Sequence, residues 1–440
     1  MGTRESIGDV YKIRHIQDPL WSKPTILEPG DQLEITLGLP ASVSDIEIVL
    51  RSPFERRGLN DVAEITETAD TLRRLTAPIP TDLDAGLYDI IVSWSGGTDV
   101  MPSAAVLVDP MPSTFQVVHM GDPHVSAALS DCPGRNLATV VRQINLLNPD
   151  FVLLTGDLIS RYGPDEETLS AAQTERDMMH AEQLLQELRV PLFISAGNHD
   201  LAYPWLRHTY RDLIARPLEG DHLNYCFNYG NIAFVTYEAF RYYDDFPPGP
   251  SRMSLSESQR TWLKRKLEKA EDAEARVLFH HYDYGDELQP IFDQYDVTVA
   301  LGGHTSGLTE EFVGTTPTLS ILEKPVFDGG HFRLLEFSDG SLVRRPYFNH
   351  DGVAGGKPID ISMTRANDGT HDENDAVLTN RTDHGFADLR VQFLMRPGHY
   401  DVTNAASVKQ TDATRAPVLC DVRLDLPARQ SRTVHIEPVG

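Results

Sequence analysis

Five short motifs in this chain place aspartate, asparagine or histidine directly after an apolar run. They are GDPH at 121–124, GD at 156–157, GNHD at 197–200, HH at 280–281 and GGH at 302–304. Carboxylate, amide and imidazole groups are ligands that suit Mn, Fe, Zn or Co, and none of the motifs offers a thiolate. Each motif alone is weak, because Asp-x-His and Gly-Asp also occur in ordinary turns. Five in succession, each after an apolar run, predict a metal centre.

The apolar runs before these motifs are typical of buried strands. They read FQVVHM, FVLLT, LFISA, RVLF and VTVAL, and they alternate with stretches of helical periodicity such as RNLATVVRQINLL and SESQRTWLKRKLEKAEDA. This alternation predicts an α/β domain that contains parallel strands. Because sites in open α/β sheets form at the carboxyl ends of the strands, we expect the five motifs to converge.

Asp157 follows the second of these strands, where its carboxylate could bridge two metal ions. Two ions about 3.5–4 Å apart can hold a phosphoryl group and activate a shared hydroxide. Glycines lie beside the candidate ligands at Gly121, Gly156, Gly197 and Gly303. They fit sharp turns in which backbone and ions come close together.

The sequence pattern changes on either side of this α/β region. Before it, alternating segments such as DQLEITLGL and DIEIVL are separated by proline and glycine, which predicts a β-sandwich over residues 1–112. After it, helical periodicity disappears, and segments such as APVLCDVRLDLP predict a second sandwich over 349–440. We therefore expect an α/β domain at 113–348 with an all-β, immunoglobulin-like sandwich on each side.

In order and content, the five motifs resemble those of the calcineurin-like metallophosphoesterases. The resemblance extends over about 113–348 and includes the connecting segments NPDFVLLTGDLI and YCFNYGNIAFVTYEA. It is greatest to the cyclic-nucleotide-phosphodiesterase-like and purple-acid-phosphatase-like branches. The resemblance implies a β-sandwich core flanked by helices and a dinuclear metal centre. Some relatives carry additional β-sandwich domains, as we expect of this chain.

Carried over residue by residue, the resemblance implies six metal ligands, which are Asp122, His124, Asp157, Asn198, His280 and His304. The first two would hold one ion, the third would bridge, and the last three would hold the second ion. His199 would donate to the phosphoryl or leaving-group oxygen, and Asp200 would orient His199. The resemblance alone favours His280 over His281 as the ligand, since strand alternation by itself does not choose between them.

The last motif departs from the family pattern, which is Gly-His-x-His. This chain has Ser306 where the second histidine would complete the first metal site. Three interpretations follow: water, or Ser306 through water, fills the position; another histidine such as His331 reaches in; or the first site is weak or empty. The family also usually has proline after the histidine pair, and this chain has Tyr282 there.

The predicted function is hydrolysis of a phosphate ester by in-line attack of a metal-bound hydroxide. The cofactors would be two divalent ions of Mn, Fe, Zn or Co, and the substrate a small phosphorylated molecule. A phosphodiester is favoured on the resemblance alone. One alternative is a module, or a weakened pseudo-phosphoesterase, that binds a phosphorylated ligand with a single metal. Another is an envelope or adhesive protein, which would need an export signal.

The chain is strongly acidic, since 39 basic and 65 acidic residues give a net charge of −26. Such a charge disfavours nucleic acid as a partner. Lysine accounts for only 8 of the basic residues, and acid excess with scarce lysine suggests adaptation to high salt; a solvated acidic surface is the simpler alternative.

The three cysteines, Cys132, Cys226 and Cys420, form no disulfide framework and no metal-binding spacing. They favour a reducing, cytoplasmic location. The N-terminus has no signal sequence, and no run of 18 apolar residues occurs, so we expect no membrane span. A leader removed from the chain would instead imply secretion.

Overall fold

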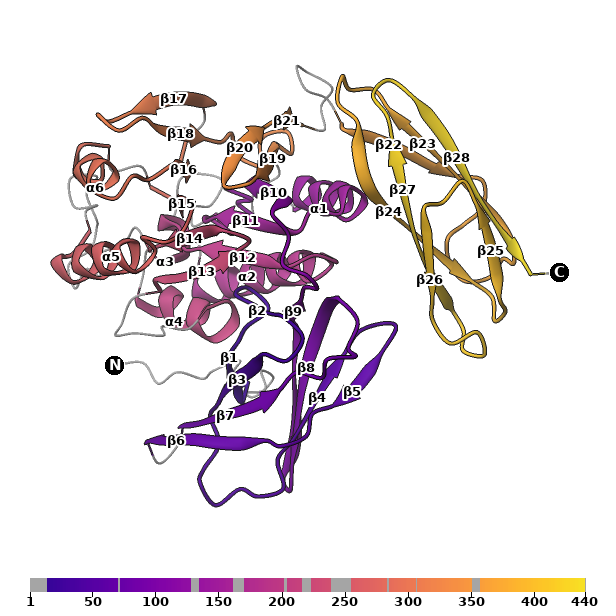
Figure 1. The fold of residues 1–440 in the computed structure, drawn as a ribbon, viewed down its shortest axis with the longest axis horizontal. Helices are drawn as coiled ribbons and strands as arrows, with labels where there is room; N and C mark the ends of the chain where they lie inside the picture. The colour runs from indigo at the N-terminus through magenta and orange to yellow at the C-terminus, as the bar shows by residue number, and fades with distance from the viewer. Residues whose placement is uncertain are drawn as a thin grey trace.

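The computed structural model describes residues 14–69, 72–127, 134–160, 170–201, 204–215, 223–238, 255–282, 285–305, 307–349 and 357–439. Its strands and helices form three groups along the chain (Figure 1). An all-strand N-terminal group lies at the bottom of the view, a helix-containing group lies above it, and an all-strand C-terminal group lies to the right. In the described residues, no helix is long and apolar enough to cross a membrane.

The N-terminal group consists of two sheets, with strand orders β1-β3-β7-β6 and β2-β9-β8-β4-β5. The strands are β1 (Ile16–Asp18), β2 (Thr25–Leu27), β3 (Gln32–Leu37), β4 (Glu47–Arg51), β5 (Arg56–Gly58), β6 (Ala63–Ala69), β7 (Leu72–Pro78), β8 (Gly86–Trp94) and β9 (Gly97–Leu107). Burial alternates along β3, where Leu33, Ile35 and Leu37 are buried. These side chains share one apolar core with Leu50 and Ile90 of the other sheet, as expected for strands with one buried face.

The central group contains two mixed sheets, with strand orders β12-β11-β10-β19-β20 and β13-β14-β15-β16-β18-β17; β21 also pairs with β19. The first sheet contains β10 (Thr114–Met120), β11 (Phe151–Thr155), β12 (Leu192–Ser195), β19 (Phe332–Ser338), β20 (Ser341–Arg344) and β21 (Tyr347–Phe348). The second contains β13 (Tyr225–Tyr229), β14 (Ile232–Thr236), β15 (Ala275–His280), β16 (Val299–Gly302), β17 (Thr309–Val313) and β18 (Thr318–Leu322). Phe151 and Phe193 of the first sheet pack in one core with Phe234 and Phe279 of the second, so the sheets form a sandwich.

Helices cover the outer faces of both sheets. They are α1 (Arg135–Leu147), α2 (Ala171–Leu185), α3 (Asn198–Leu201), α4 (Pro204–Leu213), α5 (Glu257–Lys269) and α6 (Gln289–Gln294), with a 3₁₀ turn η3 (Gly285–Glu287). Val140 of α1 shares a core with Val152 of β11. Leu263 of α5 shares another core with Leu278 of β15. The sandwich core flanked by helices is the arrangement that the resemblance implied.

Two of these helices begin at sequence signals that the chain carries locally. Ser170 caps α2 by accepting from the backbone of Gln173, whose side chain returns a bond to the cap. Ser256 and Gln259 form the same capping box at the start of α5. Each cap satisfies backbone N–H groups that a helix start otherwise leaves free, and contributes about 1 kcal/mol.

The C-terminal group also consists of two sheets, with orders β22-β23-β28-β25 and β24-β27-β26. The strands are β22 (Ile359–Met363), β23 (Asn374–Asn380), β24 (Phe386–Met395), β25 (Tyr400–Thr403), β26 (Ser407–Gln410), β27 (Val418–Leu426) and β28 (Ser431–Pro438). Val391 and Phe393 of β24 pack in one core with Leu378 of β23 and Val434 of β28. The predicted boundary at 348/349 coincides with the end of β21, and that at 112/113 lies between β9 and β10; both domain boundaries stay predictions.

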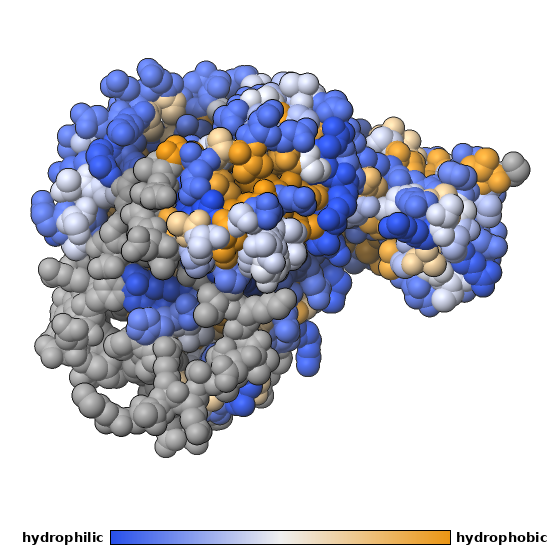
Figure 2. Space-filling model, turned by 90° about the horizontal axis from the view of Figure 1, so that it is seen from below, coloured by the Kyte–Doolittle hydropathy of each residue, from blue (hydrophilic) through white to orange (hydrophobic). Residues whose placement is uncertain are grey.

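Hydrophilic residues cover most of the described surface in the view from below (Figure 2). A group of hydrophobic residues lies near the middle of that face.

Candidate metal centre

The five motifs meet at one end of the two central sheets. In the first sheet, the amide of Asp122 after β10 donates to the carbonyl of Gly156 after β11, at 3.0 Å. In the second sheet, the amide of Gly303 after β16 donates to the carbonyl of His281 after β15, at 3.2 Å. Between the sheets, the amide of His304 donates to the Asp122 carboxylate at 3.1 Å. The strand ends therefore converge, as expected from parallel neighbours.

Two groups of side chains in the described residues could each hold a metal ion, and they share one carboxylate. The groups are His124, Asp157 and His199, and Asp157, His281 and His304; within each group the ligand atoms lie within 4.8 Å of one another. Asp157 Oδ2 lies 3.5 Å from His124 Nε2 and 3.9 Å from His199 Nε2. The same oxygen lies 3.2 Å from His281 Nε2. Asp157 thus occupies a position from which it could bridge two ions.

Asn198 and Asp122 extend the two groups. The Asn198 Oδ1 atom lies 2.8 Å from His281 Nε2, which in turn lies 3.1 Å from His304 Nδ1. The Asp122 Oδ1 atom lies 3.6 Å from His124 Nε2. The structure thus brings together five of the six predicted ligands, Asp122, His124, Asp157, Asn198 and His304. Carboxylate, amide and imidazole donors of this kind fit divalent Mn, Fe, Zn or Co.

The sixth predicted ligand, His280, lies elsewhere, and its neighbour takes its place. The His280 ring stacks on Tyr237, with centroids 5.2 Å apart, and His280 belongs to neither of the two candidate groups. Successive side chains of a strand point to opposite faces. Phe279 faces the core between the sheets and Leu278 faces helix α5, so His280 points outward with Leu278. The structure thus places His281, and not His280, beside the other candidate ligands, and which of the two binds metal stays a prediction.

His281 is held in an orientation that suits a ligand. Its Nδ1 lies 2.7 Å from the carbonyl oxygen of Thr155, which can only accept, so Nδ1 carries a proton and donates. The Nε2 atom then faces Asn198, His304 and Asp157. A backbone acceptor on the far ring nitrogen commonly orients a metal-binding imidazole.

The charges of the clustered side chains affect the pKa of each candidate ligand, and therefore the exchange of imidazole protons for metal cations. Burial lowers the pKa of His281, but the carboxylates of Asp157 and Asp122 outweigh it and raise that pKa to about 10. Burial tends to raise the pKa of Asp157, yet the charges on His281 and His199 lower it. Burial and the charge on His281 lower the pKa of His304. An imidazole must lose its Nε2 proton to bind a metal there, so metal binding would release protons.

Asp200 is fully buried and holds the backbone of two motifs together. Its carboxylate accepts from the amides of Asp157, Leu158 and Gly197, each at 2.9 Å. These bonds tie the turn after β11 to the turn after β12. The contact from Asp200 to His199 that the sequence suggested stays a prediction, while the bonds to these amides are a role that sequence reasoning missed.

The backbone at the site adopts conformations that most residues avoid. Asp122, His124, Asp157 and His304 have φ values of 54°, 44°, 55° and 61°. Non-glycine residues rarely take such values, and they concentrate at functional sites. A Cβ atom at Gly303 would lie 2.6 Å from Asp122 Oδ2 and 2.8 Å from the Thr155 carbonyl. Only glycine therefore fits beside the candidate ligand without moving it.

Two aromatic rings lie beside the candidate ligands. The ring of Phe327 lies 4.9 Å from that of His124, and the ring of Tyr282 lies 4.5 Å from that of His304. His331, considered for the first metal site, stacks instead on Tyr347 and belongs to neither candidate group. Ser306 lies outside the described residues. No sequence signal identified Phe327, whereas Tyr282 was visible as a departure from the family pattern.

Residues 115–307 match the family model of the calcineurin-like phosphoesterases. This part of the chain is a calcineurin-like phosphoesterase domain, and the family predicted from the motifs is confirmed. A relative from Moraxella catarrhalis (strain BBH18), named "Probable cyclic nucleotide phosphodiesterase", is 29% identical over 119 residues. That match covers 26% of this chain and only 39% of the relative.

Two solved structures are similar at low identity. A 5'-nucleotidase precursor from Thermus thermophilus is 17% identical, with a TM-score of 0.36 over 53% of this chain and 54% of that one. GAP50, described as the anchor in the inner membrane complex of Plasmodium, is 13% identical, with a TM-score of 0.40 over 56% of this chain and 87% of that one.

Proposed function

We propose that this chain is a metal-dependent phosphoesterase that holds two divalent cations around Asp157, with His199 beside them and not among the ligands. The sharing of Asp157 Oδ2 between the groups carries the proposal, since His124 and His281 approach the same oxygen at 3.5 and 3.2 Å. The proposed ligands are Asp122, His124, Asp157, Asn198, His281 and His304. A pair of divalent cations there would neutralise charge on phosphoryl oxygens and lower the pKa of bound water.

The protein's own side chains would position the ester and manage the proton. His199 lies at the edge of the first group, with its Nε2 3.9 Å from Asp157 Oδ2 and 15% of its side chain exposed. Its amide donates to Asp157 Oδ1 at 2.7 Å, which fixes the backbone from which the ring projects. We assign His199 to donate a proton to the leaving-group oxygen, a role usually worth about 10²–10⁴-fold in rate.

The proposed substrate is a small phosphorylated molecule, and a phosphodiester is favoured. The motif resemblance and the name of the Moraxella relative support the diester. The rings of Phe327 and Tyr282 beside the centre would suit an ester with an apolar or aromatic group. The first metal site lacks the second histidine of the family's Gly-His-x-His pattern, because this chain has Ser306 at that position. We therefore propose that the first site binds its ion more weakly than the second site does.

The test is hydrolysis of bis-(p-nitrophenyl) phosphate by the full chain after removal of metal and titration with Mn²⁺, Zn²⁺, Fe²⁺ or Co²⁺. We expect activity to require metal and to rise beyond the first equivalent. The monoester p-nitrophenyl phosphate, assayed in parallel, should be the poorer substrate. Metal binding without hydrolysis of either ester would favour the phospho-ligand-binding alternative over the enzyme.

A further inference from the structure

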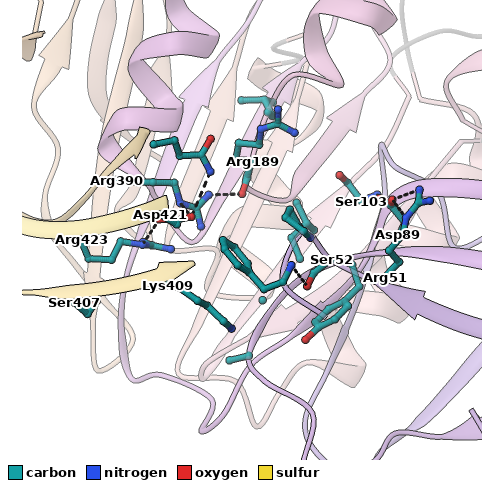
Figure 3. A pocket seen from close by; sticks show the side chains of 18 of the residues that line it. Arg51, Ser52, Asp89, Ser103, Arg189, Arg390, Ser407, Lys409, Asp421 and Arg423 are labelled. Atoms are coloured by element: carbon teal, nitrogen blue, oxygen red, sulfur yellow. Dashed lines mark hydrogen bonds and ion pairs between the residues drawn. The ribbon is translucent and has the colours of Figure 1, made fainter. Parts of the chain in front are cut away.

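A cavity of about 700 Å³ lies away from the metal centre, where all three groups of elements meet (Figure 3). One wall comes from the N-terminal sheets, including Phe54 and Tyr88, and the opposite wall from β24, β26 and β27. The segment between α2 and β12, at Leu188 and Arg189, completes the lining. Clefts of this size between structural units are where small molecules commonly bind.

The charge of this cavity is opposite to that of the chain as a whole. Five cationic residues line it, which are Arg51, Arg189, Arg390, Lys409 and Arg423, against two carboxylates, Asp89 and Asp421. In the whole sequence, acidic residues outnumber basic ones by 65 to 39. A local reversal of sign on a strongly acidic protein favours an anionic ligand.

One carboxylate in the cavity is shared by several donors. Asp421, whose side chain is 6% exposed, lies 3.3 Å from Arg390 Nε and 3.2 Å from Arg423 Nε. It also accepts from Gln392 Nε2 at 3.3 Å. Arg390 is itself largely buried and donates from Nη1 to the carbonyl of Arg189 at 2.8 Å. The two guanidinium groups thus exceed the charge of the one buried carboxylate between them.

Two carboxylates that pair with these cations from outside the lining are exposed. Lys409 pairs with Asp84 at 2.7 Å, and the Asp84 side chain is 61% exposed. Arg423 pairs with Asp388 at 2.8 Å, and the Asp388 side chain is 62% exposed. Exposed ion pairs contribute little, so an incoming anion could take over these cations while both aspartates turn to water. The ammonium of Lys409 also lies 5.3 Å from the centre of the Phe54 ring.

We propose that this cavity binds a small oxyanion with two or more negative charges, contacted by Lys409 and Arg423 and packed against Phe54. Phosphate and carboxylate groups share the chemistry that guanidinium and ammonium groups recognise. The proposal is independent of the phosphoesterase activity, because the candidate metal ligands are not among the residues that line the cavity.

Calorimetric titration of the full chain tests the proposal, after the metal has been stripped and the chelator removed. The probes are ADP, pyrophosphate, citrate and the uncharged control adenosine. Lys409→Gln and Arg423→Gln remove single cations while leaving the Arg390 contact to the backbone. Arg429→Gln is the matched control, since it removes an exposed arginine of the C-terminal group that pairs with Asp383 outside the cavity.

We expect at least one of the three anions to bind to the wild-type chain and adenosine not to bind. The affinity for that anion should fall about tenfold or more in both cavity variants, because each loses a charge-assisted contact. It should not change in the control variant. Tight binding of citrate would identify carboxylates as the groups that the cavity recognises. Tight binding of pyrophosphate or ADP would identify phosphates instead. Binding unchanged in Lys409→Gln and Arg423→Gln, or no binding of any anion at millimolar concentration, would overturn the proposal. Asp157→Asn should leave this binding intact, which separates it from failure of the metal centre.

Discussion

His281 and His280 offer a sharp comparison, because adjacent residues of one type are placed in different environments. We predict that His281→Ala loses tightly bound metal, whereas His280→Ala keeps it. His281 Nε2 faces Asn198 Oδ1 at 2.8 Å and His304 Nδ1 at 3.1 Å, so its removal takes one ligand from the second group. The His280 ring lies against Tyr237 on the outer side of the sheet.

The expected size of the effect follows from what each ring contacts. Loss of a group that merely orients a metal ligand typically costs about 10–100-fold in metal affinity. His281 is a proposed direct ligand, and its ring is oriented by the Thr155 carbonyl. Its loss should therefore lower the metal affinity by at least the upper end of that range, about 2.7 kcal/mol of binding free energy. For His280→Ala we expect little change in metal affinity but a loss of stability of about 1–3 kcal/mol, because a buried ring is removed from its stack.

The assay is elemental analysis of the purified variants followed by Mn²⁺ titration, with thermal unfolding measured on the same samples. Unfolding separates a local loss of ligand from a global loss of fold. If His280→Ala lost metal while His281→Ala kept it at native melting temperature, our placement of the two histidines would be wrong. The family-based choice of His280 would then stand.

Four further outcomes are expected. Asp157→Asn should lower activity and metal content more than any other single ligand change, because both groups share this carboxylate. His199→Ala should lower kcat by about 10²–10⁴-fold with metal content nearly unchanged; metal loss would make it a ligand. Residues 113–348 expressed alone should give an α/β circular dichroism spectrum, and an all-β or unfolded spectrum would contradict the proposed boundaries. The melting temperature should rise with KCl, because about 1 M salt shortens the screening length to about 3 Å on a chain of net charge −26; a flat or falling value would reject salt adaptation.

Much of the central fold could be predicted because its signals are local. An apolar run such as FVLLT is buried along its whole length in β11. The helix over Arg135–Leu147 follows the periodicity of its apolar residues. Convergence of the motifs then follows from topology, since parallel neighbours end at the same edge. The sandwich of two sheets came from the family resemblance, because periodicity does not say which strands pair.

The parts of the site that could not be predicted depend on strand faces and on distant contacts. The choice between His280 and His281 requires knowing that Phe279 faces the core between the sheets, which no local pattern reveals. The bonds of Asp200 to the amides of Asp157 and Leu158 join positions 43 and 42 residues away. The cavity between the three groups of elements is still harder to predict from the sequence, because its lining comes from three stretches far apart in the chain.

The hydrogen bonds of Asp200 help to explain how the strained turns of the site are held in place. Residues such as Asp157 in the left-handed region are destabilised by about 1–3 kcal/mol each. A hydrogen bond contributes about 0.5–1.5 kcal/mol, and Asp200 accepts three of them, from the amides of Asp157, Leu158 and Gly197. Asp200 can therefore hold the turn that presents Asp157 although it is not among the proposed ligands. The GNHD motif thus combines a candidate ligand in Asn198, a proposed proton donor in His199 and the residue that braces the neighbouring turn, which is a physical reason for these residue types to occur together.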